Sequence, residues 1–377
     1  MSAIYKKLEE VCEILDSRRV PITAKNRKTG IYPYYGANGL QDYVAEYIFD
    51  DELVLLAEDG GNFGSKERPI AYRVSGKCWV NNHAHVLKAK PLVNADYLCY
   101  ALMFYDTEGL VNGATRQKLT QTAMRQMMIP YRNMTEQLQI ADEINQVIRL
   151  IDKRKEELSL LDQLVKSRFI EMFGDPEKNP FGWDMSTIGV LISSCEAGWS
   201  GNGSQREKKD GEIAVLKVSA VTKGYFIPDE CKVLDDQSNI KKYVFPQEGD
   251  LLFSRANTRE MVGATAVITQ NYPEYILPDK LWRIRFVDAT NVWYMKYILS
   301  SKSIRAIFAS VSTGTSGSMF NVSMEKFKSI AVPLPPLELQ EQFAVFVTQT
   351  DKSKYLFYRL EHIRNNFNAM LEFYMGG

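Results

Sequence analysis

The chain has 377 residues, of which 45% are hydrophobic and 24% are charged, as is ordinary for a soluble globular protein. At about 150 residues per domain, this length predicts two or three folded units. Lys plus Arg and Asp plus Glu number 46 each, so the overall charge gives no support for nucleic-acid binding, and only local basic clusters could provide it.

Other features argue against several classes of protein. No apolar run approaches the roughly 20 residues that a membrane-spanning helix needs, and the first residues are charged and amphipathic, without the apolar stretch of a signal peptide. The five cysteines are scattered and form no Cys-x-x-Cys pair, so they predict neither a disulfide framework nor a zinc knuckle. We therefore expect a cytoplasmic protein that does not associate with membranes.

An internal repeat with a period of about 200 residues is the most informative feature, and it is longer than the periods of roughly 20–50 residues that mark solenoids. In each half, β-branched and aromatic runs bounded by turn residues predict short strands. These runs are Tyr47–Phe49, Glu52–Leu56, Trp79-Val80 and His85–Leu87, then Tyr243–Phe245, Gly249–Phe253, Tyr275–Leu277 and Leu281–Ile284. A Gly- and Thr-rich loop follows in both halves (113–118 and 312–318), and then an apolar residue and a proline, Ile129-Pro130 and Val332-Pro333.

Each half then ends in a Gln-rich segment that begins a long predicted helix. The first helix is expected from about Thr135, as its N-cap, to Phe173, and the second from about Leu337 to Met375. Alternating steps of four and three predict a seam for a partner helix. In the first helix the seam comprises Ile140, Ile144, Val147, Ile151, Arg154, Leu158, Leu161, Val165, Arg168 and Met172.

Two such helices, each roughly 55 Å long at 1.5 Å per residue, can pair antiparallel and hold two globular domains apart. The alternative is that each is an amphipathic helix packed on its own domain. The equivalent places of the two helices in the repeat favour the paired arrangement.

Several segments, in this order and with this duplication, carry a family resemblance. They are Tyr32–Gly39, Leu55–Gly61, Phe169–Pro176, Asn179–Trp183, and the proline-then-Gln helix starts Pro130–Gln139 and Pro333–Gln342. Together they resemble the type I restriction-modification specificity subunits over essentially the whole chain. No single motif is highly specific, whereas their order and duplication are.

The resemblance implies an α+β protein in which two mixed α/β target-recognition domains are separated by two long antiparallel coiled-coil helices, with an internal pseudo-twofold repeat. The implied parts are a first recognition domain (1–134), the family's central conserved region with a long helix (135–176), a second recognition domain (177–336) and a C-terminal conserved region with a long helix (337–377). The two recognition domains differ greatly in sequence, as an asymmetric target would require.

In such an assembly each domain would read one half of a bipartite asymmetric site in double-stranded DNA. The helices would set the spacer and dock two modification (methyltransferase) subunits, and restriction or motor subunits would join the full complex. The resemblance implies that the chain itself is not catalytic and holds no cofactor and no metal, because S-adenosylmethionine and ATP belong to the partners.

The residues expected to contact DNA are polar and aromatic side chains of predicted loops. Arg suits guanine and Asn suits adenine in the major groove, and polar loops suit phosphate contact. In the first half they are Tyr34, Tyr35, Asn38, Asn62, Asn81, Asn82, His83, Thr115, Arg116, Gln117 and Lys118. In the second half they are Trp199, Arg206, Lys208, Arg255, Asn257, Thr258, Arg259, Thr315 and Ser316. For each, a solvated loop residue is the alternative.

Two local patterns echo enzymes. Gly30-Ile31-Tyr32 and Tyr34-Tyr35-Gly36 echo the GIY-YIG nucleases, but their spacing is too short for the paired strands of that fold. Asn179-Pro180-Phe181 echoes an amino-methyltransferase tetrapeptide but lacks its second proline, and no Gly-rich cofactor turn precedes it. We interpret it as a turn after the helix. The sequence contains no P-loop, so it does not support ATP binding.

Two further patterns could bind ions. Glu58–Gly64 could hold a phosphate on backbone N–H groups, or be simply a Gly-rich turn. His83 and His85 could place two imidazoles on one side of a strand as metal ligands, but no Cys or carboxylate is near enough in sequence to complete a site. We interpret the two histidines as core or DNA-facing residues.

Three functions are left by these observations. The chain is a DNA-recognition scaffold without chemistry of its own, a self-contained DNA-modifying or DNA-cleaving enzyme, or a coiled-coil interaction protein without a DNA role. The order and duplication of the motifs favour the first.

Overall fold

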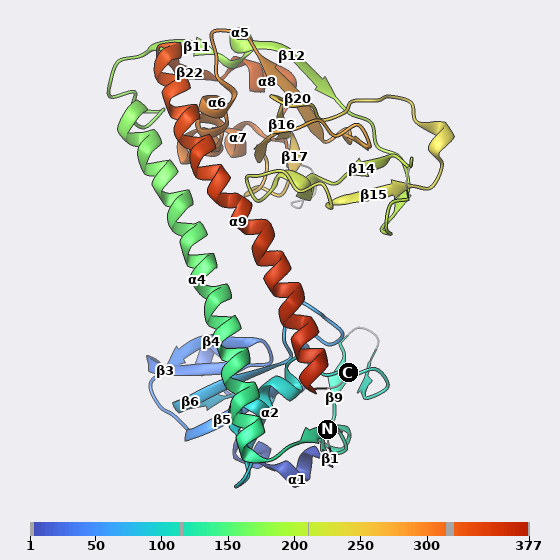
Figure 1. Ribbon diagram of the computed structural model, residues 1–377. Helices are drawn as coiled ribbons and strands as arrows, with labels where there is room; N and C mark the ends of the chain where they lie inside the picture. Colours follow the sequence, from blue (N-terminus) through green and yellow to red (C-terminus); the bar gives the residue numbers. More distant parts are fainter. Residues whose placement is uncertain (1–3, 114–115, 210, 314–319, 376–377) are drawn as a thin grey trace. The chain divides into compact units, whose positions relative to one another are not determined.

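The computed structural model describes residues 4–113, 116–209, 211–313 and 320–375. The chain divides into two compact units, unit 1 within 1–156 and 357–377 and unit 2 within 157–356. Each unit contains a part of both long helices, α4 (Met134–Phe173) and α9 (Leu337–Met375), drawn green and red in Figure 1. Among the described residues no helix is both long and apolar enough to cross a bilayer.

Unit 1 is built on a six-stranded mixed sheet. Its strand order is β2 (Cys12–Ile14), β7 (Ala84–Ala89), β5 (Phe49–Ala57), β6 (Ala71–Val80), β3 (Thr29–Gly36) and β4 (Gly39–Val44). The last five residues of the central strand β5 are all buried, as expected for a strand covered on both faces. Helix α2 (Ala95–Met103) packs on β5 and β6. The predicted strands around Leu53–Leu56, Trp79 and His85–Leu87 are confirmed.

Shorter elements complete unit 1. Strand β1 (Ile4–Lys7) pairs with β10 (Met128–Tyr131), β8 (Val111–Asn112) pairs with β9 (Lys118–Leu119), and the helices are α1 (Leu8–Val11) and α3 (Gln121–Arg125). Strand β9 follows the Gly- and Thr-rich loop predicted in the first half, so that loop ends beside the carboxyl end of β5.

Unit 2 has two four-stranded sheets. One has the order β12 (Ile192–Ala197), β20 (Leu281–Phe286), β16 (Leu251–Ser254) and β18 (Thr265–Val267); the other has β13 (Gly203–Ser204), β15 (Cys231–Leu234), β14 (Ala214–Leu216) and β19 (Tyr275–Ile276). Two ladders pair β11 (Asp184–Thr187) with β22 (Ala331–Leu334) and β17 (Ala256–Asn257) with β21 (Phe320–Asn321). The helices are α5 (Ile188–Leu191), α6 (Val292–Ser300), α7 (Lys302–Val311) and α8 (Met324–Ser329).

One expected strand of unit 2 is absent. Tyr243–Phe245 forms no ladder, although Val244 is 2% exposed. The carbonyl of Val244 accepts only an isolated hydrogen bond from Leu277, at 2.9 Å. The apolar run is therefore buried as irregular chain, a distinction that apolar content alone does not make.

The internal repeat is visible in matching contacts. In unit 1 the Tyr97 hydroxyl donates to the carbonyl of Pro130 at 2.9 Å, and in unit 2 the Tyr294 hydroxyl donates to the carbonyl of Pro333 at 2.7 Å. Both bonds join the helix after the sheet to the proline strand that precedes a long helix. The two halves thus share local structure despite their different sequences.

The long helices have the predicted extents, but the cap of the first differs. Helix α4 begins at Met134, and the Asn133 side chain accepts the backbone N–H of Glu136 at 2.9 Å. Asn133 is therefore the N-cap, and Thr135 lies inside the helix. The Asn133 amide in turn donates to the Glu136 carboxylate at 2.9 Å, a reciprocal arrangement like a capping box.

The two helices contact each other within each unit. In unit 1 the Tyr374 hydroxyl, near the end of α9, donates to Glu143 near the start of α4 at 2.5 Å. In unit 2 the ring of Phe343, near the start of α9, lies 5.4 and 5.5 Å from those of Phe169 and Phe173 at the end of α4. The predicted seam positions of α4 are all buried or half-buried. The same spacing in α9 predicts a seam of Leu339, Phe343, Phe346, Thr350, Ser353, Phe357, Leu360, Arg364, Phe367, Leu371 and Tyr374, of which Ser353, Phe357, Leu360 and Arg364 lie outside the described side chains.

Candidate nucleic-acid interface

Asp59, just after β5, contacts several polar residues at the surface of unit 1. Its Oδ1 lies 2.7 Å from Nδ1 of His83 and 2.5 Å from a guanidinium nitrogen of Arg116. The Asn38 amide donates to the carbonyl of Gly60 at 3.0 Å, and the Gly60 N–H donates to the carbonyl of Gln117 at 3.2 Å. We call Asn38, Asp59, His83, Arg116 and Gln117 the unit 1 polar cluster.

Three separate loops supply this cluster. Asn38 lies in the turn between β3 and β4, His83 in the turn between β6 and β7, and Arg116 and Gln117 precede β9. Lys118 follows directly. The side chains of Arg116 and Lys118 are 60% and 51% exposed, so both cations can reach a ligand in solvent. Five residues expected from sequence to contact DNA are thus brought together.

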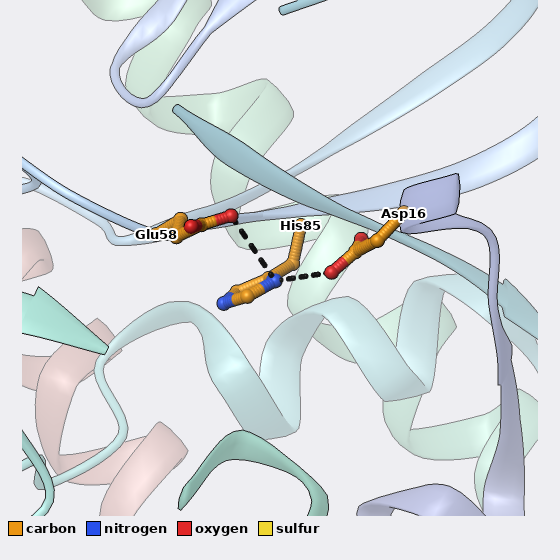
Figure 2. Close-up of side chains that lie close together, drawn as sticks. All are labelled: Asp16, Glu58 and His85. Carbon is orange, nitrogen blue, oxygen red and sulfur yellow. Dashed lines mark hydrogen bonds and ion pairs between the residues drawn. The ribbon is translucent and has the colours of Figure 1, made fainter. Parts of the chain in front are cut away.

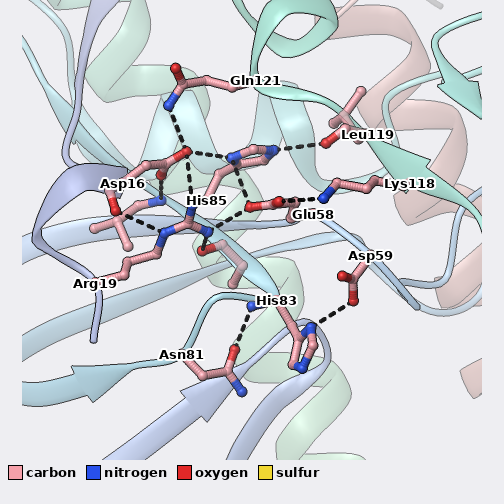
Figure 3. A network of polar contacts seen from close by, with 12 residues as sticks. Asp16, Arg19, Glu58, Asp59, Asn81, His83, His85, Lys118, Leu119 and Gln121 are labelled. Carbon is pink, nitrogen blue, oxygen red and sulfur yellow. Dashed lines mark hydrogen bonds and ion pairs between the residues drawn. The ribbon is translucent and has the colours of Figure 1, made fainter. Parts of the chain in front are cut away.

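A buried ion network lies beside Asp59 and His83 of the unit 1 polar cluster (Figure 3). Nδ1 of His85 lies 2.6 Å from Oδ2 of Asp16 and 3.7 Å from Oε2 of Glu58 (Figure 2). The Arg19 guanidinium lies 2.6 Å from Glu58 and 3.4 Å from Asp16. His85 is 1% exposed. We call Asp16, Arg19, Glu58 and His85 the buried network.

Both ring nitrogens of His85 face hydrogen-bond acceptors. Nδ1 faces the Asp16 carboxylate, and Nε2 lies 3.0 Å from the carbonyl oxygen of Leu119. Burial raises the pKa of Asp16, but the hydrogen bond and charge of His85, with the N–H of Val86, outweigh it and hold that pKa below its usual value. Both partners are hydrogen-bond acceptors, so a ring nitrogen of His85 that carries a proton donates to the one it faces.

Glu58 is also ionised. Burial raises its pKa, but hydrogen bonds from Arg19 and Lys118 bring the pKa of Glu58 below its usual value. The network thus sets two carboxylates against the Arg19 guanidinium and the His85 ring, with Lys118 3.1 Å from Glu58 at its edge. Buried charges compensated in this way are those that folded proteins tolerate.

The same side chains have the spacing of a metal site, but not its chemistry. The ligand atoms of Asp16, Glu58 and His85 lie within 4.8 Å of one another. A metal bound to His85 would have to replace its contact with Asp16 or with the Leu119 carbonyl, and it would sit beside the Arg19 cation. His83 bonds Asp59 instead, so the two histidines do not form the shared site considered from sequence.

Burial overturns two expected DNA contacts. Tyr34 is 1% exposed and its hydroxyl donates to the carbonyl of Ile22 at 3.3 Å, so it is a core residue. Asn81 is 2% exposed, accepts the N–H of His83 at 2.8 Å and bonds Gln41 at 3.1 Å. Neither side chain presents surface to a ligand. Asn81 instead shapes the turn that carries His83.

Of the two alternatives for Glu58–Gly64, a phosphate site on backbone N–H groups is not formed at the start of the segment. The N–H groups of Glu58 and Asp59 both donate to the carbonyl of His83, at 2.9 and 3.4 Å, and that of Gly60 donates to Gln117. The two carboxylates would also repel a phosphate. Asn62 bonds the carbonyl of Pro69 at 3.5 Å.

Two more expected residues of unit 1 differ in exposure. Asn82 is exposed in the turn before β7. Tyr35 is half-buried, packs on the sheet core, and its ring centroid lies 5.9 Å from that of Tyr72. Only the first is open to solvent without rearrangement.

In unit 2 a second set of expected residues lies together. Arg255 donates to the carbonyl of Asp279 at 2.8 Å and lies 3.4 Å from its carboxylate. Asn257 accepts the N–H of Thr258 at 2.9 Å, and the Arg259 guanidinium lies 5.9 Å from the ring of Phe320. We call Arg255, Asn257, Thr258 and Arg259 the unit 2 polar cluster.

The remaining candidates of unit 2 lie on its other sheet. Trp199 packs against a small apolar core there, and the Lys208 ammonium lies 5.5 Å from the ring of Tyr275. Arg206 makes two 2.8 Å bonds to Glu212, whose pKa falls to about 2 because of that pairing and the N–H of Lys209. Thr115, Thr315 and Ser316 lie outside the described residues.

The two enzyme-like patterns are explained by local structure. Both glycine-tyrosine halves of the first lie in the single strand β3, so they form no pair of strands. In the second, Asn179 adopts a positive φ of 41°, its side chain accepts the N–H of Trp183 at 2.9 Å, and its amide donates to the carbonyl of Trp183 at 2.7 Å. The turn interpretation is confirmed.

Sequence reasoning did not identify Asp16, Arg19, Asp59 or Asp279 as site residues. The acidic pair after β5 is a local signal for Asp59, since a charge that ends a buried strand needs a partner. Asp16 has no such signal, because its partner His85 lies far along the chain. Only the register of the sheet brings them together.

Comparison with known proteins agrees with this architecture. A family model described as the type I restriction modification DNA specificity domain matches twice, at residues 4–160 and 180–359. The fold and the duplication thus define a DNA specificity protein. The chain belongs to the family of type I restriction-modification specificity subunits.

Individual proteins that are similar to this chain belong to the same family. A Haemophilus influenzae protein named as type I restriction enzyme specificity subunit S.HindORF215P is 27% identical over 90% of this chain and 85% of its own. The Escherichia coli EcoKI specificity subunit is 21% identical over 79% of this chain and 67% of its own. The crystal structure of an S subunit from M. genitalium shares the fold, with a TM-score of 0.58 at 13% identity, covering 98% of this chain and 96% of that one.

Proposed function

We propose that the chain reads a bipartite, asymmetric DNA site, with one unit on each half-site, and that it carries out no chemistry itself. The observation that carries the proposal is the repetition of one local fold with different polar side chains. Leu119 donates to the carbonyl of Glu58 at 2.7 Å in unit 1, and Val322 donates to that of Arg255 at 2.9 Å in unit 2.

These equivalent bonds place Glu58-Asp59 and Arg255-Ala256 at corresponding points of the repeat. Unit 1 offers Arg116, Lys118, His83 and Asn38 there, whereas unit 2 offers its own arginines and Asn257. Arg and Asn read different base edges. Two similar frameworks with different side chains therefore suit two different half-sites.

We assign the recognition domains to 1–134 and 177–336, the central region with its helix to 135–176 and the C-terminal region with its helix to 337–377. The paired helices, as an antiparallel coiled coil, set the spacer and dock two modification subunits. These methyltransferase partners supply the methyl-transfer chemistry, and restriction or motor subunits join the complete assembly. The assembly acts on double-stranded DNA, and we assign the chain to the cytoplasm.

Exposed apolar side chains on the helices support docking. Leu138, Leu160 and Leu164 of α4 and Val345 of α9 are 51 to 57% exposed. Leu160 and Leu164 lie one helical turn apart, and neighbouring exposed apolar side chains of this kind suit contact with a partner.

The test is selection of binding sites from duplexes with a long random segment. The probe is the chain purified with its modification partners. We expect two short motifs separated by a fixed unread spacer; a single uninterrupted motif would contradict the proposal. The chain alone, with DNA, S-adenosylmethionine, magnesium and ATP, should show neither methyl transfer nor cleavage, and robust turnover would favour the self-contained enzyme.

A further inference from the structure

Side chains of the buried network, together with the backbone bonds of β9, hold the segment that carries Arg116 and Lys118 to unit 1. His85 donates to the carbonyl of Leu119 at 3.0 Å, and Glu58 accepts from Lys118 at 3.1 Å. Gln121, the first residue of α3, donates to Asp16 at 2.9 Å. Three members of the network therefore contact the four-residue stretch 118–121 directly.

The fold does not require ions at this place, as unit 2 shows. In the ladder β5–β7 His85 pairs with Leu56, two residues before Glu58; in the ladder β16–β20 Trp282 pairs with Phe253, two residues before Arg255. Trp282 thus corresponds to His85.

Unit 2 closes this position with aromatic packing. The Trp282 ring is stacked 5.5 Å from that of Phe253 and lies 5.5 Å from that of Phe327. Apolar packing of similar volume stabilises a fold at least as well as buried ion pairs do, because it avoids their desolvation. Charged and polar side chains add a defined geometry, because each hydrogen bond holds one particular atom of the segment that carries Arg116 and Lys118.

We propose that Asp16, Arg19, Glu58 and His85 are positioning residues for DNA reading by unit 1, and that they hold the 116–119 segment so that Arg116 and Lys118 meet the DNA in one arrangement. This inference rests on the proposed function. None of the four needs to touch DNA. Their effect is confined to the half-site of unit 1, because unit 2 has its own framework.

Two substitutions at His85 separate this role from general stability. In His85→Asn the side-chain amide reaches only the place of Nδ1, so the bond to Asp16 is kept and that to the Leu119 carbonyl is lost. In His85→Gln the amide reaches the place of Nε2, so donation to Leu119 is kept. The matched control is Trp282→Phe, at the corresponding position of unit 2.

The readout is the relative affinity of the complex with its modification partners for duplexes with each single base changed in either half-site of the selected sequence. For His85→Asn we expect discrimination at one half-site to fall about fivefold or more, the weaker end of a lost base contact. The other half-site should change less than about twofold. His85→Gln should restore most of the loss, and Trp282→Phe should leave the half-site of unit 1 unchanged.

The outcomes separate the two proposals. If the wild-type complex selects no two-part site, the proposed function fails, and this inference with it. If it does, and His85→Asn has the wild-type profile or weakens both half-sites equally, only the positioning role is overturned. If His85→Asn does not assemble with its partners, Glu58→Gln replaces it as the test variant. This substitution keeps the shape of the side chain but removes the charge that holds Arg19 and Lys118. An unchanged profile of base discrimination in Glu58→Gln would overturn the inference.

Discussion

The side-chain carbonyl of Gln137 accepts the backbone N–H of Asn94 at 2.8 Å, although the two residues belong to different helical segments. Its amide donates to the carbonyls of Leu92 and Arg132 at 3.0 and 2.8 Å, and the side chain is 0% exposed. Gln340 repeats the arrangement in unit 2, accepting from Asn291 at 2.9 Å. The Gln-rich helix starts are thus explained by buried backbone groups that need a partner.

The first prediction is that Gln137→Leu destabilises the chain by about 3 kcal/mol, because three buried backbone groups lose their partner at about 1–3 kcal/mol each, offset in part by relaxation. Urea unfolding of the full chain measures it. Gln139→Leu, on the exposed face of the same helix, is the matched control and should cost about 0.5 kcal/mol or less. Equal effects of the two substitutions would show that the buried bonds contribute little.

The second prediction concerns the two arginines of the polar clusters. Arg116→Ala and Arg255→Ala should relax base discrimination at different half-sites, by about 1–3 kcal/mol at one position each. If the arginine contacts a phosphate instead, its loss should weaken binding to all sequences alike. It should also reduce the slope of log affinity against log salt concentration by about one. Competition binding by the partner-bound complex tells these apart. If both variants retain the wild-type affinity and site choice, the cluster assignments are wrong.

The third prediction is loss of local stability in acid. Asp16 and Glu58 have pKa values below their usual range in the folded chain, so they contribute stability above their unfolded pKa values, near 4. That contribution is lost as the pH falls through the folded values. Hydrogen exchange of the Val86 amide, which donates to Asp16 at 2.8 Å, reports the loss.

After correction for the intrinsic exchange rate, protection of Val86 should fall as the pH drops below about 4, the unfolded pKa of the two carboxyls, because their folded pKa values lie lower. The amide of Arg283, at the corresponding register position in unit 2, is the control. Asp16→Asn should remove much of the acid dependence at Val86. Parallel loss at both amides in the wild type would indicate global unfolding instead.

The fourth prediction uses the cysteines. Burial raises the pKa of Cys12, Cys78 and Cys99 to about 12, so their thiolates are scarce at neutral pH. Cys231 is half-buried and its pKa is raised less. At pH 8 a thiol reagent should modify Cys231 before these three, as peptide mass spectrometry would show. Early modification of Cys78 would contradict its position in the sheet.

The long helices and the repeat could be predicted because each depends on a pattern within one segment. The end of α4 at Phe173 was predicted correctly, and its predicted N-cap, Thr135, lies two residues after the actual one, because the cap Asn133 depends on a side-chain bond that the sequence pattern does not reveal. The strand run Tyr243–Phe245 failed for a related reason, since burial without a pairing partner does not make a ladder.

The sequence allowed us to predict the chemistry of the candidate site residues, but not which of them are buried. Arg116 and Lys118 were predicted as basic residues of a polar loop, and both are exposed. Tyr34 and Asn81 have equally suitable chemistry, but the sheet turns them inward, and only tertiary packing decides that. The buried network was not predictable, because Asp16 and His85 meet only through the register of β2 beside β7.

The last prediction concerns the spacer that we assign to α4 and α9. Inserting seven residues at facing positions of both helices preserves the heptad phase and adds about 10 Å, since a helix rises about 1.5 Å per residue. At about 3.4 Å per base pair this corresponds to about three base pairs. The duplex also turns by nearly a third of its roughly 10.5-base-pair repeat over that length, so binding to the native spacer should be weakened or lost.

Selection of binding sites by the doubly extended chain, purified with its modification partners, is the most direct measurement. Circular dichroism and recovery of the complex establish that the variant is folded, and an insertion into α4 alone serves as the mismatched control. We predict unchanged half-site sequences, with either a spacer longer by about three base pairs or no binding to sites with the native spacer. An unchanged preferred spacer in the folded double insertion would contradict the role of the helices in setting the distance between the half-sites.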